Sequence, residues 1–372
     1  MKKRLYIYHL FISHGRKDLG FCSDIDGLIN QLDYIQEMGF NAIMTNPLFP
    51  SESFHGYDIS TFDDIDDKIG GMDAFNRLIK ELENRNMQLI FDITFAHTGR
   101  SHKYFQDFLK GENDYYVMRD YIENDISSDM HPTCHFWDEN LKKYVLGAFG
   151  GHMPSLNVES ESYKKEIARV IKFWLSKSKC IGLRADAILH SRVTAKNHNP
   201  IPFVKYIRDV VNEINPNAKI IAEVWLNANM RDEPKPYADI LGGAFDFTTC
   251  FEIMLQIRDG KTFEEIQVGS HNAEHNFVTM LDNHDMTRIK TMLNGDENKV
   301  RLALKTLIEK TDGDISIYYN TELGYEGHVI NGNDIGVRQQ SNVIDMAYAI
   351  KDKNSLFYYI KDLIEKDKVK RK

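Results

Sequence analysis

Residues 182–190 read GLRADAILH. Six of these nine residues are glycine or apolar, a composition typical of a short strand buried on both faces of a parallel sheet. The same stretch holds a cation, an anion and an imidazole, namely Arg184, Asp186 and His190. Taken alone, Arg184 and Asp186 are explained most simply as a buried ion pair. The sequence on either side decides whether that explanation is sufficient.

Strand-like and helix-like segments alternate along most of the chain. Short apolar runs predict strands at 4–12, 41–49, 87–97, 181–189, 218–225, 242–250, 276–285 and 313–324. Apolar residues at three- and four-residue spacing predict helices at 26–39, 72–86, 162–178, 202–214, 251–260, 297–310 and 356–366. Repeated strand–helix units give a parallel sheet, and eight such units close into a barrel with the helices outside. The sequence therefore predicts an α/β fold, a (β/α)8 TIM barrel.

The alternation is interrupted at residues 98–157, which are polar and aromatic and contain Gly150, Gly151 and Pro154. Long stretches without secondary structure are uncommon in compact domains, so we expect a small inserted subdomain there, after the third strand. The barrel itself is expected to comprise 1–97 and 158–372. The weakly patterned stretch 325–353 is expected to be a long loop before the last helix.

Composition limits the classes of partner. The 46 basic and 55 acidic residues give a net charge of −9, which argues against nucleic acid or an anionic membrane surface as a ligand. The basic cluster KDKVKRK at 366–372 is expected to be a frayed, solvated tail. Cys22, Cys134, Cys180 and Cys250 form no CxxC pair, so neither a zinc site nor a disulfide framework is predicted, and a reducing, cytoplasmic location is expected.

The N-terminal residues MKKRLYIYHLFISHG place basic residues before a short apolar run that His9 interrupts. This pattern favours a first strand over a signal peptide. No segment approaches the roughly 18 apolar residues of a membrane-spanning helix. A membrane is therefore not expected as a partner.

Polar residues collect where successive predicted strands end, which is the face of such a barrel that carries active sites. They are Tyr57 in the loop after the second strand, Asp92 and His97 on the third, Arg184, Asp186 and His190 on the fourth, Glu223 on the fifth, and Asn283, His284 and Asp285 on the seventh. Considered by itself, each of these residues can be explained by structure alone: a carboxylate that faces solvent, a residue in a turn or helix cap, or a core histidine whose hydrogen bonds are satisfied. Carboxylates at a barrel mouth are costly unless paired, so their repeated placement points to a catalytic site.

Two carboxylates on neighbouring strands fit the retaining hydrolysis of glycosides. In that reaction one carboxylate attacks the anomeric carbon and the other protonates the leaving oxygen, with about 5–5.5 Å between them. Adjacent strands, about 4.8 Å apart, can set this gap between Asp186 and Glu223. Like charges nearby should raise the pKa of the acid. Arg184, two residues earlier on the same face of its strand, can hold Asp186 in its ionised form.

A series of segments resembles the alpha-amylase family of glycoside hydrolases (family 13). FDITFAH, IGLRADAILH, IIAEVW and MLDNHD are similar to the four conserved regions of that family, in order. MPSLN at 153–157, HGYD at 55–58 and YNTELG at 319–324 resemble its region before the fourth strand, its sugar-stacking loop and its eighth strand. Together these segments cover the chain from about residue 5 to residue 325.

The resemblance implies roles for individual residues. Asp186 would be the nucleophile, Glu223 the general acid and base, and Asp285 the group that binds sugar hydroxyls and stabilises the transition state. His97 and His284 would hydrogen-bond the sugar, Tyr57 would stack on it, and His190 would lie near a leaving-group subsite. Arg184 would orient Asp186, with Asp92 and Asn283 as structural support. The implied substrate is an α-glucan oligosaccharide or polysaccharide, and no cofactor is required.

The chain departs from the family pattern at several positions. The family usually has an Asn that helps to bind calcium where this chain has Ala96, which puts the usual calcium site in doubt; no metal ligand is assigned. A Lys usually precedes the position of His190, and here it is Leu189. An Asp-Tyr pair is replaced by Thr61-Phe62, and the β-sandwich that usually follows the barrel is not in this sequence. The small Ala187 after the nucleophile, together with MPSLN, which resembles neopullulanase-like members, favours α-1,4 over α-1,6 cleavage.

Three functions stay open from the sequence. The first is a retaining α-glucan hydrolase that cleaves α-1,4-glucosidic bonds of maltooligosaccharides or starch. The second is an α-glucosyl transferase or a phosphorylase on the same scaffold, because both share the covalent intermediate and differ in the acceptor. The third is a non-catalytic module with the same fold that acts by binding. The oligomeric state is not predicted.

Overall fold

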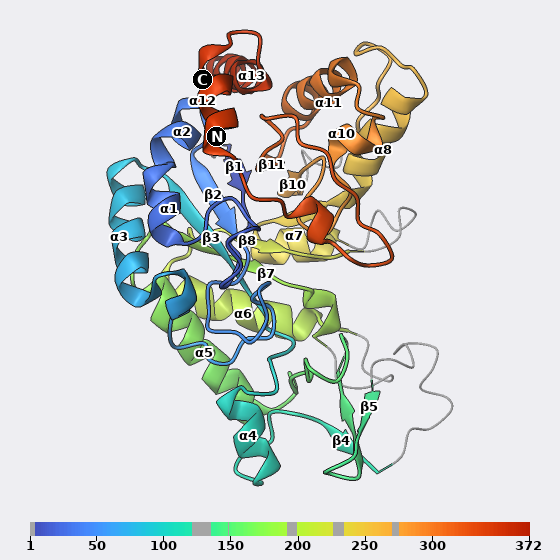
Figure 1. Cartoon of the computed structure of the whole chain (residues 1–372). Coiled ribbons are helices and arrows are strands. Elements are labelled where there is room, and N and C mark those ends of the chain that lie inside the picture. Colours follow the sequence, from blue (N-terminus) through green and yellow to red (C-terminus); the bar gives the residue numbers. More distant parts are fainter. Residues whose placement is uncertain (1–3, 121–134, 148, 192–198, 226–233, 270–274) are drawn as a thin grey trace.

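Eight parallel strands close into a barrel in the computed structural model, which describes residues 4–120, 135–147, 149–191, 199–225, 234–269 and 275–372. The strands are β1 (Tyr6–His9), β2 (Ala42–Thr45), β3 (Gln88–Ile93), β7 (Ile181–Ala185), β8 (Ile220–Ala222), β9 (Ala244–Asp246), β10 (Phe277–Thr279) and β11 (Asp314–Tyr318). Strand β1 pairs with β2 on one side and β11 on the other, so the first and last strands close the ring (Figure 1). The predicted α/β barrel is confirmed.

Helices surround the barrel. They are α1 (Ile25–Asn30), α2 (Leu32–Glu37), α3 (Gly71–Asn84), α5 (Glu161–Leu175), α6 (Ile201–Ile214), α7 (Lys235–Leu241), α8 (Phe247–Arg258), α10 (Ile289–Met292), α11 (Glu297–Lys310), α12 (Val343–Lys351) and α13 (Leu356–Lys370). Short 3-10 turns lie at Asp67–Ile69, Ile188–His190 and Ile335–Val337. Helix α3 buries Ala74, Phe75, Leu78 and Leu82, a spacing that places one apolar face against the strands.

The interior of the barrel is filled by a separate apolar layer. Ile7, Met44, Ile90, Ile221, Phe245 and Val278, each from a different strand, belong to one buried cluster. A larger cluster lies between the strands and the helices. A packed interior of this kind supports residues at the mouth of the barrel rather than forming a pore.

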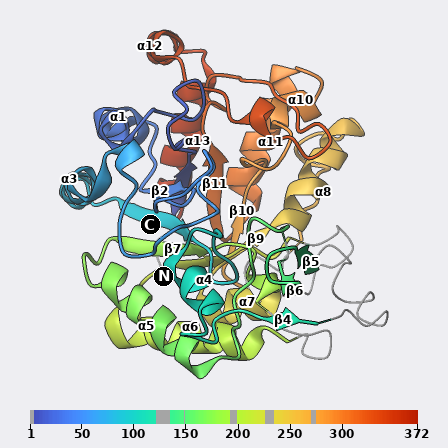
Figure 2. The same cartoon turned by 60° about the horizontal axis from the view of Figure 1, so that its bottom comes forward.

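The segment 98–157 contains helix α4 (Lys103–Leu109) and a three-stranded antiparallel sheet. Its strands β4 (Met118–Arg119), β6 (Lys143–Leu146) and β5 (His135–Asp138) lie in that order, with β6 in the centre. Isolated bridges pair His97 with Ser155 and Tyr116 with Leu156, which brings the end of the segment back to the chain that leaves β3. Figure 2 shows this sheet beside the barrel. The exact subdomain boundaries stay a prediction.

Several predicted elements were wrong in extent. The strand predicted at 242–250 stops at Asp246, because the Asp246 side chain accepts a hydrogen bond from Thr249 N at 2.9 Å and begins helix α8. The other strands also end earlier than predicted. The single helix predicted at 26–39 is divided into α1 and α2 at Gln31. The stretch 325–353, predicted as a loop, contains α12.

The basic C-terminus is not a frayed tail. Helix α13 continues to Lys370, and within it Asp367 is buried. Asp367 Oδ2 lies 2.7 Å from Arg4 Nη1 and 2.8 Å from Arg371 Nε, and it also accepts a hydrogen bond from Tyr6 OH at 2.7 Å. This cluster ties the end of the chain to the first barrel strand.

In the described part of the chain, Cys22, Cys180 and Cys250 are free thiols, while Cys134 lies outside the described residues. None of the described helices is both long and apolar enough to cross a membrane.

We expect Asp367→Ala to destabilise the fold by about 3 kcal/mol, because Arg4 would keep a buried charge without its partner. Urea unfolding measures the change. Asp18→Ala, which removes an exposed partner of Arg16, is the matched control and should leave the unfolding midpoint unchanged. Equal stability of Asp367→Ala and the wild type would contradict this interpretation of the C-terminal cluster.

Candidate active site

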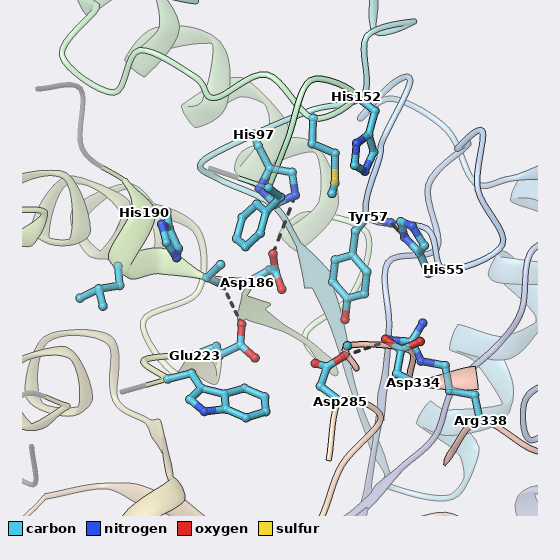
Figure 3. Close-up of a pocket in the computed structure, with 16 residues that line it drawn as sticks. His55, Tyr57, His97, His152, Asp186, His190, Glu223, Asp285, Asp334 and Arg338 are labelled. Carbon is cyan, nitrogen blue, oxygen red and sulfur yellow. Dashed lines mark hydrogen bonds and ion pairs between the residues drawn. The ribbon is translucent and has the colours of Figure 1, made fainter. Parts of the chain in front are cut away.

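A cavity of about 640 Å³ opens beyond the C-terminal ends of the barrel strands. Residues lining it are His55, Tyr57, His97, Phe149, His152, Met153, Asp186, Ala187, Leu189, His190, Glu223, Trp225, Asp285, Gly332, Asp334 and Arg338. Figure 3 shows Asp186, Glu223 and Asp285 around the same space. The other predicted site residues, Asp92, Arg184, Asn283 and His284, are buried, and the contacts below place them beneath the lining.

Asp186 and Glu223 each follow the last residue of a barrel strand, β7 and β8. Their backbones stay attached to the barrel, since Asp186 N donates to Ile93 O at 3.1 Å and Glu223 N donates to Ala185 O at 3.0 Å. The two carboxyl groups therefore take their positions from neighbouring strands rather than from free loops.

Arg184 contacts both carboxyl groups from below. Its Nη1 lies 2.6 Å from Asp186 Oδ1 and also pairs with Asp92 Oδ2, while its Nη2 pairs with Glu223 Oε1. All four side chains are almost fully buried. The predicted contact between Arg184 and Asp186 is present, and the guanidinium also holds Glu223, which the sequence did not predict.

The backbone after the nucleophile candidate adds a further contact. Ala187 has φ 42° and ψ 40°, in the left-handed region that residues with a side chain seldom adopt. Its N–H donates to Glu223 Oε2 at 2.9 Å. The strained turn thus directs a backbone donor at the second carboxyl group.

Burial governs the protonation of this pair. It raises the pKa of Glu223 to about 8, with the charges of Asp186 and Asp285 adding to the rise and Arg184 opposing it. Burial also raises the pKa of Asp186, against the attraction of Arg184. We expected like charges to raise the pKa of the acid, but loss of water has the larger effect. Glu223 therefore keeps its proton near neutral pH.

A chain of hydrogen bonds links Tyr57 to the bottom of the cavity. Tyr57 OH donates to Asp92 Oδ2 at 2.8 Å and lies 2.7 Å from His284 Nε2. Because the hydroxyl proton goes to Asp92, His284 Nε2 acts as the donor to Tyr57. His284 Nδ1 then accepts from His9 Nε2 at 3.3 Å. Burial lowers the pKa of His284 well below its usual range, so this imidazole is neutral.

Asp285 lies beside this chain, with its Oδ2 at 3.1 Å from His284 Nε2. Asn283 is buried, and its Oδ1 accepts a hydrogen bond from Asp285 N at 2.8 Å. Asn283 therefore shapes the turn that presents Asp285.

His97 faces the cavity as a neutral group. It is 1% exposed, burial lowers its pKa to about 3, and its Nε2 lies 3.9 Å from Asp186 Oδ2. Neither ring nitrogen has a hydrogen-bond partner among the described residues. A buried imidazole without a protein partner in a cavity wall is suited to hydrogen-bond a ligand. His190 also lines the cavity and lies farther along the chain in the 3-10 turn, with its ring 5.0 Å from that of Phe149.

Sequence reasoning missed Arg338 and Asp334. Arg338 Nη2 lies 2.9 Å from Asp285 Oδ1 and also pairs with Asp334, while Arg338 Nε donates to His284 O at 3.0 Å. The guanidinium lies 4.7 Å from the centre of the Phe11 ring. Both residues belong to the stretch that showed no periodicity, and nothing local in the sequence marks them.

The described residues contain no group of three or more His, Cys, Asp or Glu side chains arranged to hold a metal ion. At the position where calcium was in question, Ala96 offers only its carbonyl, which accepts from Leu156 N at 2.8 Å. Nearby, the Arg100 guanidinium pairs with Asp138 and donates to Gly151 O at 3.2 Å. The Arg100 guanidinium therefore joins the start of the inserted segment to its later part.

Comparison with known proteins gives one consistent family. A model of the alpha amylase catalytic domain matches residues 12–354. Alpha-amylase 3 of Dictyoglomus thermophilum is 30% identical over 336 residues, which are 87% of this chain and 65% of that protein. A 4-alpha-glucanotransferase of Thermotoga maritima is 28% identical over 332 residues, which are 86% of this chain and 72% of that protein.

A solved structure has the same fold. The alpha-amylase from H. orenii superposes with a TM-score of 0.82 at 22% identity, covering 98% of this chain and 82% of that chain. The chain spans just under two thirds of the length of the Dictyoglomus relative.

We expect the Glu223→Gln variant to become more stable than the wild type as the pH rises. The pKa of the Glu223 carboxyl is about 8 in the folded state and 4.5 in the unfolded state, so between these values the unfolded state releases the proton while the folded state still holds it. The wild type should therefore lose stability between about pH 4.5 and pH 8, while the amide of the variant does not titrate. Thermal unfolding across this range should show a growing advantage of the variant, with an upper limit of about 5 kcal/mol.

Glu309→Gln, at an exposed position on α11, controls for the loss of one negative charge. A constant difference in stability between Glu223→Gln and the wild type at all pH values would contradict the raised pKa.

Proposed function

The chain belongs to the alpha-amylase family of glycoside hydrolases, family 13, and on that premise we propose that it cleaves α-1,4-glucosidic bonds of maltooligosaccharides or starch with retention of configuration. The observation that carries the proposal is the pair Asp186 and Glu223, attached to neighbouring strands and held by one guanidinium, that of Arg184. Retaining hydrolysis needs two carboxyl groups close together, one ionised and one protonated. The pKa of about 8 at Glu223 supplies the protonated partner.

In the first step of the proposed reaction, Asp186 attacks the anomeric carbon while Glu223 gives its proton to the leaving glycosidic oxygen. The bond to the leaving sugar breaks, and an ester forms between the glucosyl unit and Asp186. In the second step Glu223, now ionised, takes a proton from a water molecule. That water attacks the same carbon, releases Asp186 and restores the original configuration.

The remaining residues bind and orient the sugar. Asp285 accepts hydrogen bonds from sugar hydroxyls as positive charge develops on the ring. His97, whose ring nitrogens have no protein partner in the described structure, supplies a neutral donor and acceptor next to Asp186. Tyr57 lies on the cavity wall with its hydroxyl fixed by Asp92 and its ring stacked against that of His284, and we expect the ring to contact the sugar from the cavity side. The open cavity volume of about 640 Å³ is sufficient for more than one sugar unit.

A transferase is the second candidate, and one observation favours it: the relative from Thermotoga maritima is named 4-alpha-glucanotransferase. The first step is common to both reactions, and the acceptor in the second step is a sugar hydroxyl instead of water. Incubation of maltotriose alone distinguishes them, because a transferase produces longer chains, whereas a hydrolase produces only glucose and maltose. Addition of inorganic phosphate tests for a phosphorylase through the release of glucose 1-phosphate.

The cytoplasmic location stays a prediction, with which the free thiols agree.

The proposal predicts that the protein releases shorter sugars from maltoheptaose and that these are α-configured when first formed. Proton NMR during the reaction measures the anomer. Asp186→Asn should lower kcat by about 10³-fold or more, because the amide is a poor nucleophile. A 2-deoxy-2-fluoro maltosyl fluoride should label Asp186, which mass spectrometry of the digested protein detects.

The opposite results would exclude the proposal. β-Configured products would require a different mechanism, and no turnover of any α-glucan, with Asp186→Asn behaving like the wild type, would favour the non-catalytic binding module.

We also expect Arg338 to position Asp285. Arg338→Met removes the contacts with Asp285 Oδ1 and with the carbonyl of His284, so kcat should fall about 100-fold, the order expected when a catalytic group is misplaced by about 1 Å. Arg338→Lys keeps the charge and should recover part of kcat. A change in KM with unchanged kcat would mean that Arg338 only binds substrate.

A further inference from the structure

The sheet of the inserted segment carries a row of large polar and aromatic side chains on one face. In the antiparallel pairs, Trp137 on β5 lies opposite Tyr144 on β6, and Tyr144 lies opposite Arg119 on β4. Residues directly opposite in antiparallel strands project from the same face and contact one another. Arg119, Tyr144 and Trp137 thus form one continuous row across all three strands, which we call the aromatic row.

Exposure to solvent differs between positions of this sheet. On the face opposite the aromatic row, Val145 is fully buried, and Phe136 packs against the main core with the Arg100 guanidinium 5.5 Å from its ring centre. On the face of the aromatic row, the neighbouring pair His135 and Leu146 is buried, whereas Trp137 is 42% exposed. Packing of the sheet therefore accounts for the buried side chains, and it leaves the indole ring of Trp137 facing solvent beside Tyr144 and Arg119.

The geometry of the aromatic row suits a curved sugar chain. The rings of Trp137 and Tyr144 lie 5.0 Å apart at 63°, so they form a corner rather than a flat plate. Aromatic rings stack on the apolar C–H face of a pyranose, and the indole N–H, phenol hydroxyl and guanidinium can hydrogen-bond its hydroxyls. Successive glucose units of an α-1,4-linked chain turn relative to one another, so two inclined rings can contact adjacent units.

The aromatic row is continuous in sequence with the wall of the active-site cavity. Strand β6 ends at Leu146, and Phe149, His152 and Met153, only a few residues later, line the cavity. One short segment therefore contributes Tyr144 to the row and, through residues such as His152 (Figure 3), part of the cavity wall. A ligand with many identical units can occupy both places, and binding at one then raises the effective concentration at the other.

We propose that the aromatic row is a second binding surface for α-1,4-glucan polymers, separate from the cavity. This inference rests on the proposed function for its choice of ligand. The surface holds the polymer by stacking on Trp137 and Tyr144 and takes no part in bond cleavage. It should therefore affect polymeric substrates and leave short ones, which fill only the cavity, unaffected.

Affinity electrophoresis in gels that contain amylopectin tests the proposal. The assay uses Asp186→Asn as the parent so that the polymer is not digested. Trp137→Ala in that parent should weaken binding about tenfold, the equivalent of a lost contact of about 1.4 kcal/mol. In the active enzyme, the same change should raise KM for amylopectin and leave kcat/KM for maltotriose unchanged. Trp137→Phe, which keeps a stacking ring, should recover much of the binding.

Tyr348→Ala is the matched control, because Tyr348 is 68% exposed on α12 and its replacement removes an accessible ring outside the aromatic row. Trp137→Leu, which keeps apolar volume without a stacking face, and Arg119→Ala repeat the test if Trp137→Ala does not fold.

The outcomes separate this inference from the proposed function. If maltotriose is cleaved and Trp137→Ala and Trp137→Leu bind amylopectin as tightly as the parent, the aromatic row is not a binding surface. The same holds if the parent itself is not retarded by amylopectin. If no α-glucan of any length is cleaved, the proposed function fails instead, and retardation by amylopectin that depends on Trp137 would still support the binding surface.

Discussion

One guanidinium, that of Arg184, holds together the charged groups at the mouth of the barrel. It contacts Asp92, Asp186 and Glu223, and all three carboxyl groups are buried. One cation cannot neutralise three anions, and an uncompensated buried charge is costly. Uptake of a proton reduces that cost, and the pKa of about 8 identifies Glu223 as a group that holds it. The difference in protonation that acid–base chemistry needs therefore follows chiefly from burial, and the excess of carboxyl groups over cations adds to it.

The position of this guanidinium depends in turn on strand register. Asp92 on β3 is the direct partner of Arg184 on β7, and Ile221 on β8 is the partner on the other side. A slip of one residue would turn every side chain on β7 to the opposite face. The apolar layer below opposes such a slip, since Ile90, Ile221 and Phe245 fill the barrel and the Arg184 guanidinium lies 6.0 Å from the Phe245 ring. Packing of the interior thus sets the geometry of the charges.

Periodicity was sufficient to predict the barrel and the residues at the ends of its strands, because both depend on short-range pattern. The same reasoning extended the strands too far: the run at 87–97 is apolar beyond Ile93, where β3 ends. It could not detect the buried state of Asp367, whose partner Arg4 lies at the other end of the chain and which stands among basic residues. Helix α12 was missed because Val343, Ile344 and Tyr348 are exposed, so its pattern does not match an apolar face turned inward.

The site combines two sources of geometry. Asp186 and Glu223 are fixed by strands, backbone hydrogen bonds and Arg184, whereas Asp285 is also held by Arg338 from the irregular stretch between β11 and α12. The opposite wall comes from the inserted segment through Phe149 and His152. Changes in either irregular segment can alter the shape of the cavity, or the angle of Asp285, without disturbing the packed barrel. The pair that would make and break bonds is therefore supported by the part of the sequence with the clearest pattern. The groups that would select the substrate come from the irregular segments, where the sequence pattern is least clear.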